Sequence, residues 1–271
     1  MVSVGADGRP SIVAILGVKG GVGASVIAVG LASELTGIAS PCVVDLDLYK
    51  GDIAGLLGLT VTDTLASILG MVSVMDPVAL RGAAATHPSG LSIIGQPDAL
   101  KDARSPDAPE LGAFLTLARQ AFDPVFIDCG SRVDPQTVQV CAEADVVVLV
   151  TTPELLSLRD LNRVSALLID LGVPRDRLRV LVNKADRSPE VPLDEIGPLT
   201  GLPVAGVVRR DLTAARKATG SGQPVPDAAP GSRLCADLQG AWTALSGELL
   251  EPAAAARWWQ RLFQRPSPAL P

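Results

Sequence analysis

Short runs of apolar, often β-branched residues alternate with longer stretches of helical periodicity along most of the chain. Most of these runs are continuously apolar, as parallel strands covered by helices on both faces require. The alternation predicts an α/β fold, in which a mainly parallel, doubly wound sheet is flanked by helices. The predicted strands are residues 12–16, 42–45, 91–94, 125–128, 146–150, 179–182 and 204–208, and the clearest predicted helices are residues 25–36, 111–122 and 155–171.

Proline and glycine, which interrupt helices and strands, indicate where the alternation of predicted strands and helices is broken. Segments rich in proline and glycine at residues 98–109 and 220–231 are predicted to be surface loops. The forty residues after Gly231 look helical and contain no further strand pattern. We therefore predict a sheet-bearing domain over residues 1–231 and a helical C-terminal tail over residues 232–271.

Composition and charge narrow the class of protein. The chain has 23 basic and 29 acidic side chains and a net charge of -6, which disfavours general nucleic-acid binding but leaves room for a local basic patch. No apolar run approaches the ~18–20 residues that span a bilayer, and the first residues lack the apolar core of a secretory signal. The four cysteines form no C-x-x-C pair, which argues against a disulfide framework or a zinc site. We expect a cytoplasmic protein.

A glycine-rich segment, V-K-G-G-V-G-A-S at residues 18–25, follows the first predicted strand and opens directly into a predicted helix. Its three glycines allow backbone amides to turn inward, and with the positive end of the helix these amides form a phosphate cradle. Ser25 stands where a phosphate-binding loop places the hydroxyl that holds Mg²⁺. The alternative is a glycine-rich turn without a ligand, but the order of strand, loop and helix favours nucleotide binding.

One residue of this loop departs from the usual pattern. Phosphate-binding loops usually end in Gly-Lys-Ser or Gly-Lys-Thr, whereas Ala24 occupies the lysine position here and Lys19 stands at the other end of the loop. Phosphoryl transfer depends mostly on positioned positive charge. We therefore expect weakened binding and slow or absent hydrolysis, with binding supported by the backbone amides and Mg²⁺.

Aspartates follow two of the predicted strands. Asp45 and Asp47 lie on the same side of one strand end, where such a pair can hold the hydration shell of Mg²⁺ and orient an attacking water. Asp128 ends another apolar strand and can bind Mg²⁺ through water. Ordinary turn or capping aspartates are the alternative. Asp52 is predicted to be the N-cap of a short helix over residues 53–57.

The string V-L-V-N-K-A-D at residues 180–186 ends a predicted strand at Asn183. An asparagine amide offers both a donor and an acceptor, which matches the edge of a purine. We include Lys184, the next residue, among the predicted nucleotide-binding residues. The string also looks like the N-K-x-D of GTPases, so the base is not determined by these residues alone.

Taken together, these motifs resemble the deviant phosphate-loop ATPases of the MinD/ParA class, whose loop reads K-G-G-x-G-K-S/T. The resemblance implies ATP and Mg²⁺ as ligands, a nucleotide-linked homodimer in which Lys19 reaches the partner's nucleotide, and a contact between Asn183 and adenine. It makes Lys19 and Asp47 the catalytic candidates. Where the class commonly has Pro-x-Asp, this chain has Arg209, whose role at the base stays open. The predicted nucleotide-binding residues are Gly20, Gly21, Val22, Gly23, Ala24, Ser25, Asn183 and Lys184, and the predicted Mg²⁺ residues are Ser25, Asp45 and Asp128.

The altered loop combined with D-L-D-L-x-x-G-D-I-A-x-L-L-G-L is similar to one branch of this class, the CpaE/TadZ proteins of tight-adherence (Flp) pilus and related type IV pilus-like secretion systems. This resemblance implies a localisation factor that marks a cell pole and recruits the pilus or secretion machinery with little turnover. The alternatives are an active ATPase that cycles like MinD or ParA, a ParA-like DNA partitioner, and a scaffold with a vestigial loop.

The end of the chain is basic and aromatic, in R-W-W-Q-R-L-F-Q-R at residues 257–265. On a helix its aromatic and aliphatic residues share one face and its arginines lie beside that face. Such a helix suits packing on the domain or on a partner protein, and equally the surface of an anionic membrane, where it would place the protein peripherally; the residues leave both open. The residues of this segment are Trp258, Trp259, Leu262, Phe263, Arg257, Arg261 and Arg265.

Overall fold

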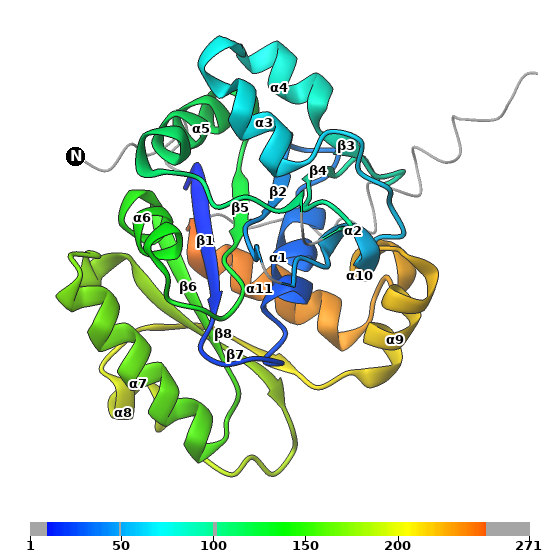
Figure 1. Cartoon of the computed structure of the whole chain (residues 1–271). Coiled ribbons are helices and arrows are strands. Elements are labelled where there is room, and N and C mark those ends of the chain that lie inside the picture. Colours follow the sequence, from blue (N-terminus) through cyan, green and yellow to red (C-terminus); the bar gives the residue numbers. More distant parts are fainter. Residues whose placement is uncertain (1–9, 49, 100–101, 248–271) are drawn as a thin grey trace, which may run out of the picture.

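The computed structural model describes residues 10–48, 50–99 and 102–247. Among these residues eight strands form one sheet in the order β3-β4-β2-β5-β1-β6-β7-β8 (Figure 1). All neighbouring strands run parallel except β3, which pairs antiparallel with β4 at the edge. The strands are β1 (Ile12–Gly17), β2 (Cys42–Asp45), β3 (Ala85–Thr86), β4 (Ser92–Ile94), β5 (Val125–Asp128), β6 (Val146–Thr151), β7 (Leu178–Ala185) and β8 (Val204–Arg209).

The sheet is the centre of the hydrophobic core. Every residue of β1, β2 and β5 is buried, which explains why these strands are continuously apolar in the sequence. The seven predicted strands are all present, and none of their ends differs from the prediction by more than three residues. The pattern did not predict β3, because a strand of two residues is too short to leave a periodic signal.

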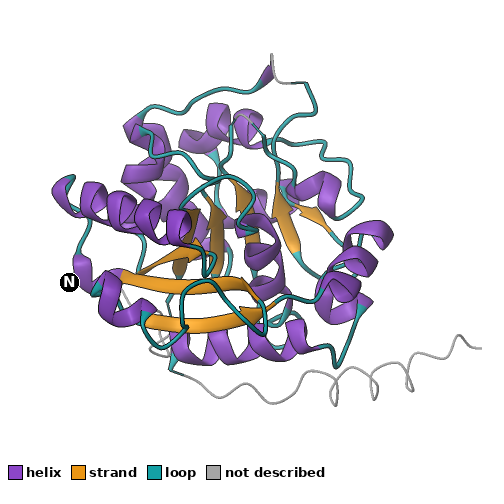
Figure 2. Cartoon of the chain, turned by 90° about the horizontal axis from the view of Figure 1, so that it is seen from below, coloured by secondary structure: helices purple, strands orange, loops and turns teal. Residues whose placement is uncertain are grey.

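Helices lie on both sides of the strands (Figure 2), so the predicted doubly wound α/β fold is confirmed. Helix α1 packs against α11, α5 packs against α6, and α7 lies against β6. The helices are α1 (Ala24–Ser33), α2 (Ile53–Leu56), α3 (Leu65–Met71), α4 (Pro77–Ala83), α5 (Ala108–Ala121), α6 (Pro135–Glu143), α7 (Leu155–Asp170), α8 (Ile196–Thr200), α9 (Leu212–Ser221), α10 (Val225–Ala228) and α11 (Arg233–Ser246), with short 3₁₀ turns η1 (Val72–Val74) and η3 (Arg175–Arg177).

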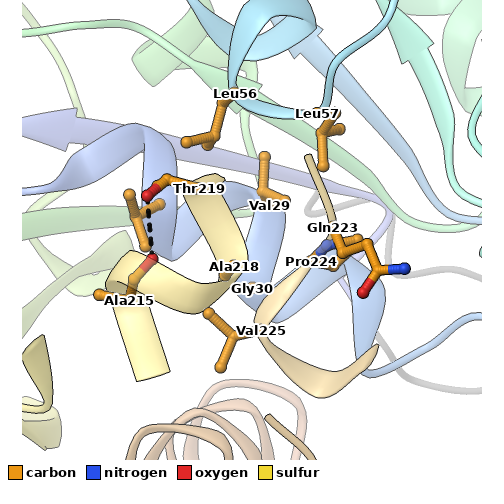
Figure 3. A pocket seen from close by; sticks show the side chains of 11 residues that line it. Val29, Gly30, Leu56, Leu57, Ala215, Ala218, Thr219, Gln223, Pro224 and Val225 are labelled. Atoms are coloured by element: carbon orange, nitrogen blue, oxygen red, sulfur yellow. Dashed lines mark hydrogen bonds between the residues drawn. The ribbon is translucent and has the colours of Figure 1, made fainter. Parts of the chain in front are cut away.

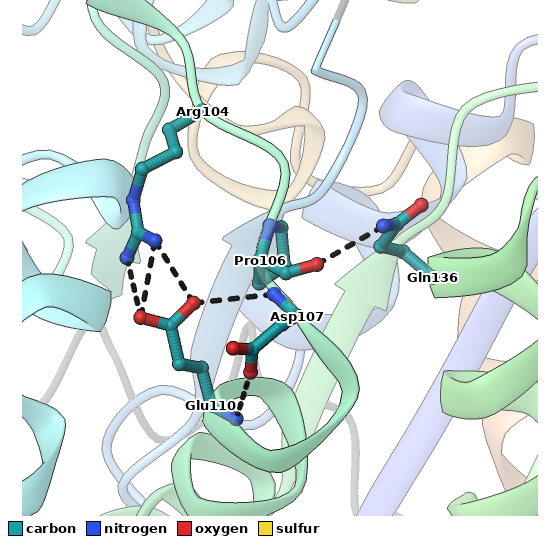
Figure 4. A network of polar contacts seen from close by, with 5 residues as sticks. All are labelled: Arg104, Pro106, Asp107, Glu110 and Gln136. Carbon is teal, nitrogen blue, oxygen red and sulfur yellow. Dashed lines mark hydrogen bonds and ion pairs between the residues drawn. The ribbon is translucent and has the colours of Figure 1, made fainter.

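Side chains fix the point at which α5 begins. The carboxylate of Asp107 accepts a hydrogen bond from the Glu110 backbone N–H at 2.8 Å, and the Glu110 carboxylate accepts one from the Asp107 N–H at 3.1 Å. This reciprocal pair is a capping box. Arg104 adds an ion pair with Glu110 at 2.9 Å, and Gln136 donates to the Pro106 carbonyl at 3.0 Å (Figure 4). The end of the predicted loop 98–109 is therefore tied to α5 and α6.

The predicted loop over residues 220–231 was wrong in part. It contains the end of α9 and the short helix α10, and Gly222 ends α9 with a left-handed φ of 62°. The cavity that these helices enclose with α1 and α2 has a volume of about 10 Å³, at most one water molecule (Figure 3). Its wall is mainly apolar and includes Val29, Leu57 and Ala218. The C-terminal helices thus pack closely on α1.

Helix α11 belongs to the same core. Trp242 is fully buried and its ring centroid lies 5.5 Å from that of Phe126 on β5. A Cβ on Gly206 of β8 would lie 2.9 Å from the Cβ of Ala241, so strand and helix are in close approach. Residues 232–247 therefore pack on the sheet, and the fold does not end at residue 231 as the predicted tail implied. The predicted aromatic and basic segment, residues 257–265, lies outside the described residues.

Two further observations concern the described part of the chain as a whole. None of its helices combines the length and the apolar character needed to cross a bilayer. The four cysteines are free thiols, and all are buried.

Candidate functional site

The glycine-rich loop connects the end of β1 to the start of α1. The Gly17 N–H donates to the Gly130 carbonyl at 2.8 Å and the Val18 N–H to the Val150 carbonyl at 3.0 Å, so the ends of β5 and β6 hold the start of the loop. Gly21 and Gly23 have φ values of 80° and 95°, a left-handed conformation that favours glycine. No atom lies within 4 Å of where a Cβ on Gly21 would sit, so the loop is open on that side.

The N-terminus of α1 carries no side-chain cap. Gly23 is its N-cap residue, and the first turn contains no acidic residue. The first amides of a helix need an acceptor and carry the positive end of the helix dipole. In phosphate-binding loops such amides bind a phosphate group. Ala24 is buried in the hydrophobic core, so no cationic side chain enters from its position.

Lys19 and Glu154 form an ion pair across the mouth of the loop. The Lys19 ammonium lies 2.7 Å from the Glu154 carboxylate, and this contact is the first cause that holds the pKa of Glu154 below its ordinary value. Glu154 is the N-cap residue of α7, yet its side chain makes no capping bond. The predicted reach of Lys19 to a partner's nucleotide stays a prediction, and in this chain Lys19 is held by its own protomer.

The strand-end aspartates meet at one edge of the sheet. Asp45 and Asp128 are register partners on β2 and β5, and both are 1% exposed. Burial, followed by the charge of Asp128, raises the pKa of Asp45 to about 8. Burial also raises the pKa of Asp128, and the Ser25 hydroxyl and the Gly130 N–H counteract this shift by hydrogen bonding to its carboxylate. The predicted proximity of Ser25 to these carboxylates is thus present.

The side chain of Asp45 is engaged by backbone amides. Its two carboxylate oxygens accept hydrogen bonds from the Asp47 N–H at 3.2 Å and the Ile53 N–H at 3.1 Å. The second bond caps α2 from a distance of eight residues. Asp52, the predicted N-cap, occupies the N-cap position but makes no side-chain capping bond, so that prediction was wrong in its mechanism. Asp45 therefore has a structural task at the place where a Mg²⁺ role was predicted.

Asp47 follows the last residue of β2 by two positions. It is half-buried, and its carboxylate accepts the Lys50 N–H at 3.0 Å. A Cβ on Gly130, whose φ is 64°, would lie 2.5 Å from an Asp47 oxygen, so only glycine allows this approach. Asp47 thus reaches across to the segment that follows β5, beside Asp128.

The donor set at this edge fits a magnesium ion that arrives with a nucleotide. Ser25, Asp47 and Asp128 offer hard oxygen atoms, and Mg²⁺ in phosphate sites uses one or two protein ligands together with phosphate oxygens and waters. The described residues contain no group of three or more His, Cys, Asp or Glu side chains that could hold a metal by themselves. The buried carboxylates, with raised pKa values, are groups whose ionised forms a cation would stabilise.

At the end of β7, Asn183 and Lys184 hold the loop from the other side. The Asn183 amide donates to the Val22 carbonyl at 2.7 Å, and its oxygen accepts the Lys184 N–H at 2.8 Å. The Lys184 ammonium donates to the Gly21 carbonyl at 2.5 Å. A contact between Asn183 and adenine stays a prediction, because part of its amide is already used by the loop.

The two arginines at the end of β8, Arg209 and Arg210, differ in their contacts. Arg209 forms a forked pair with Asp237 of α11, at 2.6 Å for the closest atoms, and therefore joins the end of β8 to the last helix. Arg210 lies 3.1 Å from Asp186, in the segment that follows β7. Arg209, at the position where the class has Pro-x-Asp, is thus occupied by a structural contact.

The sequence did not indicate Glu154 or Gly130 as part of this site. Glu154 stands in T-T-P-E directly after β6, and the same reasoning that selected Asp128 at a strand end also applies to it. Gly130 follows Asp128 by two residues, but the close approach of Asp47 that requires a glycine there depends on the fold.

The chain is similar in sequence to several known proteins. No protein-family model matches the chain. An uncharacterised ATP-binding protein of Methanocaldococcus jannaschii, MJ0547, is 27% identical over 220 residues, which are 79% of this chain and 79% of that protein. The septum site-determining protein MinD of a Synechocystis species is 24% identical over 210 residues, 74% of this chain and 76% of that protein.

The chain is also similar in fold to solved structures of ParA and MinD proteins. A ParA family ATPase from Chlorobium tepidum is similar with a TM-score of 0.79 and 27% identity, over 85% of this chain and 97% of that one. The MinD protein of Pyrococcus horikoshii, solved with Mg-ADP, is similar in fold with a TM-score of 0.72 and 21% identity, over 85% and 93% of the two chains. In its glycine loop, its strand-end aspartates, its sequence and its fold, the chain is thus similar to P-loop ATPases of the MinD/ParA family.

Proposed function

We propose that this protein binds Mg-ATP and acts as a MinD/ParA-type ATPase in the positioning or partitioning of a cellular component. The observation that carries the proposal is the open loop at the uncapped start of α1, where Ser25 lies near enough to Asp128 to counteract the rise in the pKa of that carboxyl. The relatives support ATP, since one is named an ATP-binding protein and another was solved with Mg-ADP.

Each residue of the site has a task in this proposal. The amides of residues 20–25 bind the phosphates, and Ser25 and Asp128 are the residues that would hold Mg²⁺, whose charge offsets that of the phosphates. Asp47 orients an attacking water by accepting one of its protons in a hydrogen bond. Asp45 shapes this edge by fixing α2 and the Asp47 backbone. Asn183, on the loop, is the proposed contact to adenine.

Dimer formation is part of the proposal. Lys19 completes the site of a second copy only after it leaves Glu154, since one ammonium cannot serve both at the present distance of 2.7 Å. We further propose that the aromatic and basic segment at residues 257–265 attaches the protein to a membrane surface or to a partner protein. Liposome co-sedimentation of the full chain and of a chain ending at residue 256 tests the membrane; equal binding by both would contradict it.

The rate of hydrolysis distinguishes two roles. Ala24 favours slow turnover and the narrower role of a CpaE/TadZ-like localisation factor for a pilus or secretion machine. The relatives found here are MinD and ParA proteins, and they favour an ATPase that cycles. Steady phosphate release comparable to that of MinD-like ATPases supports the cycling ATPase, whereas tight binding without release supports the localisation factor.

The central experiment is calorimetric titration of Mg-ATP together with steady-state phosphate release. We expect binding by the wild type, an affinity at least tenfold lower for Ser25→Ala, and loss of phosphate release for Asp47→Ala. Ser221→Ala, on the exposed end of α9, is the matched control and should bind as the wild type does. A wild type that neither binds nor hydrolyses Mg-ATP contradicts the proposal and identifies the loop as vestigial.

A further inference from the structure

The phosphate loop of this chain lacks the cation that such loops carry. Ala24 stands at the usual lysine position and is 8% exposed, with its side chain in the hydrophobic core. The side chains of Asp45, Asp47 and Asp128 lie at the same edge of the sheet and bring no positive charge to it. A nucleotide bound here needs positive charge from another part of the fold.

Strand β7 is distorted where it passes the loop. Its pairing with β8 shifts register between Val182 and Ala185, so the intervening residues form a bulge. Lys184 lies in this bulge with a φ of 57°, the one left-handed residue other than glycine among the described residues. Bulges re-aim side chains near active sites, and such a conformation persists only where surrounding contacts hold it. Here the distortion turns both Asn183 and Lys184 toward the loop.

The contacts made by the bulge are specific to the loop. Asn183 donates to the carbonyl of Val22 and Lys184 donates to that of Gly21, two consecutive residues of the glycine segment. The Lys184 Cε would lie 3.9 Å from a Cβ on Gly23. Its ammonium is therefore at the rim of the cradle rather than in solvent away from it.

Other cations at this edge are already neutralised by carboxylates. Lys19 is paired with Glu154, and Arg210 is paired with Asp186. Lys184 differs, because no ion pair within the described part of the chain includes it and its partner is a neutral carbonyl. An ammonium has three N–H donors, so two remain after the bond to Gly21.

We propose that Lys184 supplies the positive charge that the loop lacks at position 24, by donating from the bulge in β7 to phosphate oxygens of the bound nucleotide. The cation that other loops carry at the first residue of α1 would here come from the end of β7, which lies two strands from β1 in the sheet. This inference rests on the proposed function, since it requires a nucleotide in the loop.

The inference is tested by comparing nucleotides that carry three, two and one phosphate groups. Affinities for Mg-ATP, Mg-ADP and AMP are measured by calorimetry on the full chain, for the wild type, Lys184→Met and Lys184→Arg. The methionine variant keeps the unbranched stem and removes the charge, while the arginine variant keeps the charge. Lys217→Met, on exposed α9, controls for the loss of one positive charge elsewhere.

We expect Lys184→Met to lose affinity for Mg-ATP by roughly 10- to 100-fold, the size expected of a hydrogen bond to a charged group. The loss should shrink for Mg-ADP and fall below about twofold for AMP, and Lys184→Arg and Lys217→Met should stay close to the wild type. If the methionine variant does not fold, Lys184→Gln is measured in its place.

Two results would overturn the inference while leaving the proposed function intact. An equal loss for all three nucleotides would assign Lys184 to the sugar, the base or the shape of the loop. Unchanged Mg-ATP affinity would show that its charge is not used. A wild type that binds no nucleotide contradicts the proposed function itself, and the inference with it.

Discussion

The candidate site has an acidic side and a cationic side, and the two differ in how the protein surrounds their ionisable groups. On the acidic side, formed by Asp45, Asp47 and Asp128, burial raises the pKa of Asp45 and of Asp128, and neighbouring carboxylates add to both shifts. On the cationic side, formed by Lys19, Lys184 and Arg210, each side chain already has a partner in the protein.

This difference indicates which side supplies the driving force for binding. Charged groups held in a low-dielectric edge of the sheet cost free energy until an opposite charge arrives, so the acidic side gains when Mg²⁺ enters with a nucleotide. The cationic side gains less, because a pair such as Lys19 with Glu154 must be broken before the ammonium acts elsewhere. Substitutions on either side, and in the loop between them, can test this contrast.

The largest effect is expected for Gly23→Ala, in the loop that separates the two sides. The alanine Cβ would lie 2.6 Å from the Asn183 amide nitrogen, and φ at this position is 95°. We expect a loss of about 2 kcal/mol of unfolding free energy from backbone strain and the displaced amide, and at least 100-fold weaker Mg-ATP binding. Urea unfolding and calorimetry measure the two effects.

Gly20→Ala is the matched control for this substitution. Its Cβ would meet no atom within 4 Å, and its φ is not in the left-handed region. Its unfolding free energy should stay within about 0.5 kcal/mol of the wild type. Equal destabilisation by both alanines would show that the contact with Asn183 does not shape the loop.

The second prediction separates two aspartates that are two residues apart. Asp45→Ala leaves the buried Ile53 N–H without its acceptor, so we expect a loss of about 1–3 kcal/mol of unfolding free energy. Asp47→Ala should change stability by less than about 0.5 kcal/mol, because the exposed Lys50 N–H can form a hydrogen bond with water instead, but it should abolish phosphate release. Thermal unfolding without nucleotide, read beside the release assay, distinguishes them; similar stability losses for both variants would contradict the division of tasks.

The sequence was sufficient for the sheet and for the order of the site. Parallel strands covered on both faces are apolar throughout, and their carboxyl ends meet at one edge, so the loop and the aspartates of β2 and β5 could be placed together in advance.

What the sequence could not supply were the contacts between distant segments. A local rule assigned the cap of α2 to the adjacent Asp52, whereas the fold brings Asp45 to that position. His87 is 5% exposed, and its Nε2 lies 3.0 Å from the Gly222 carbonyl, 135 residues away. A contact between two residues so far apart in the sequence produces no periodic pattern around either residue. The sequence alone therefore does not predict it.

A third and smaller effect concerns the end of β8. Arg209→Ala removes the forked contact with Asp237 and should lower the melting temperature modestly, since this arginine is 52% exposed and its pair is screened by solvent. Mg-ATP affinity should change by less than about twofold, because the side chain is directed to α11. Arg210→Ala serves as the comparison at the neighbouring position. A tenfold loss of affinity for Arg209→Ala alone would move this residue to the cationic side of the site.

The smallest effect is expected for Glu154→Gln, which keeps the shape of the side chain and releases Lys19. Exposed ion pairs contribute little to stability, so unfolding should be nearly unchanged at neutral pH. Because Lys19 lowers the pKa of Glu154, the pair contributes above the ordinary carboxyl pKa and its contribution is lost as the pH falls through the lowered value. The variant should therefore show a slightly flatter decline of stability in acid than the wild type.

The informative measurement on this variant is its assembly with Mg-ATP. If Glu154 holds Lys19 away from a second copy, the glutamine variant should dimerise a few-fold more readily in sedimentation velocity, and Lys19→Ala should cancel the gain. Weaker dimerisation of Glu154→Gln would show instead that the carboxylate moves into the interface together with Lys19. In that case the ion pair between Lys19 and Glu154 is part of the dimer interface and need not break when the dimer forms. The cationic side would then favour ligand binding as much as the acidic side does.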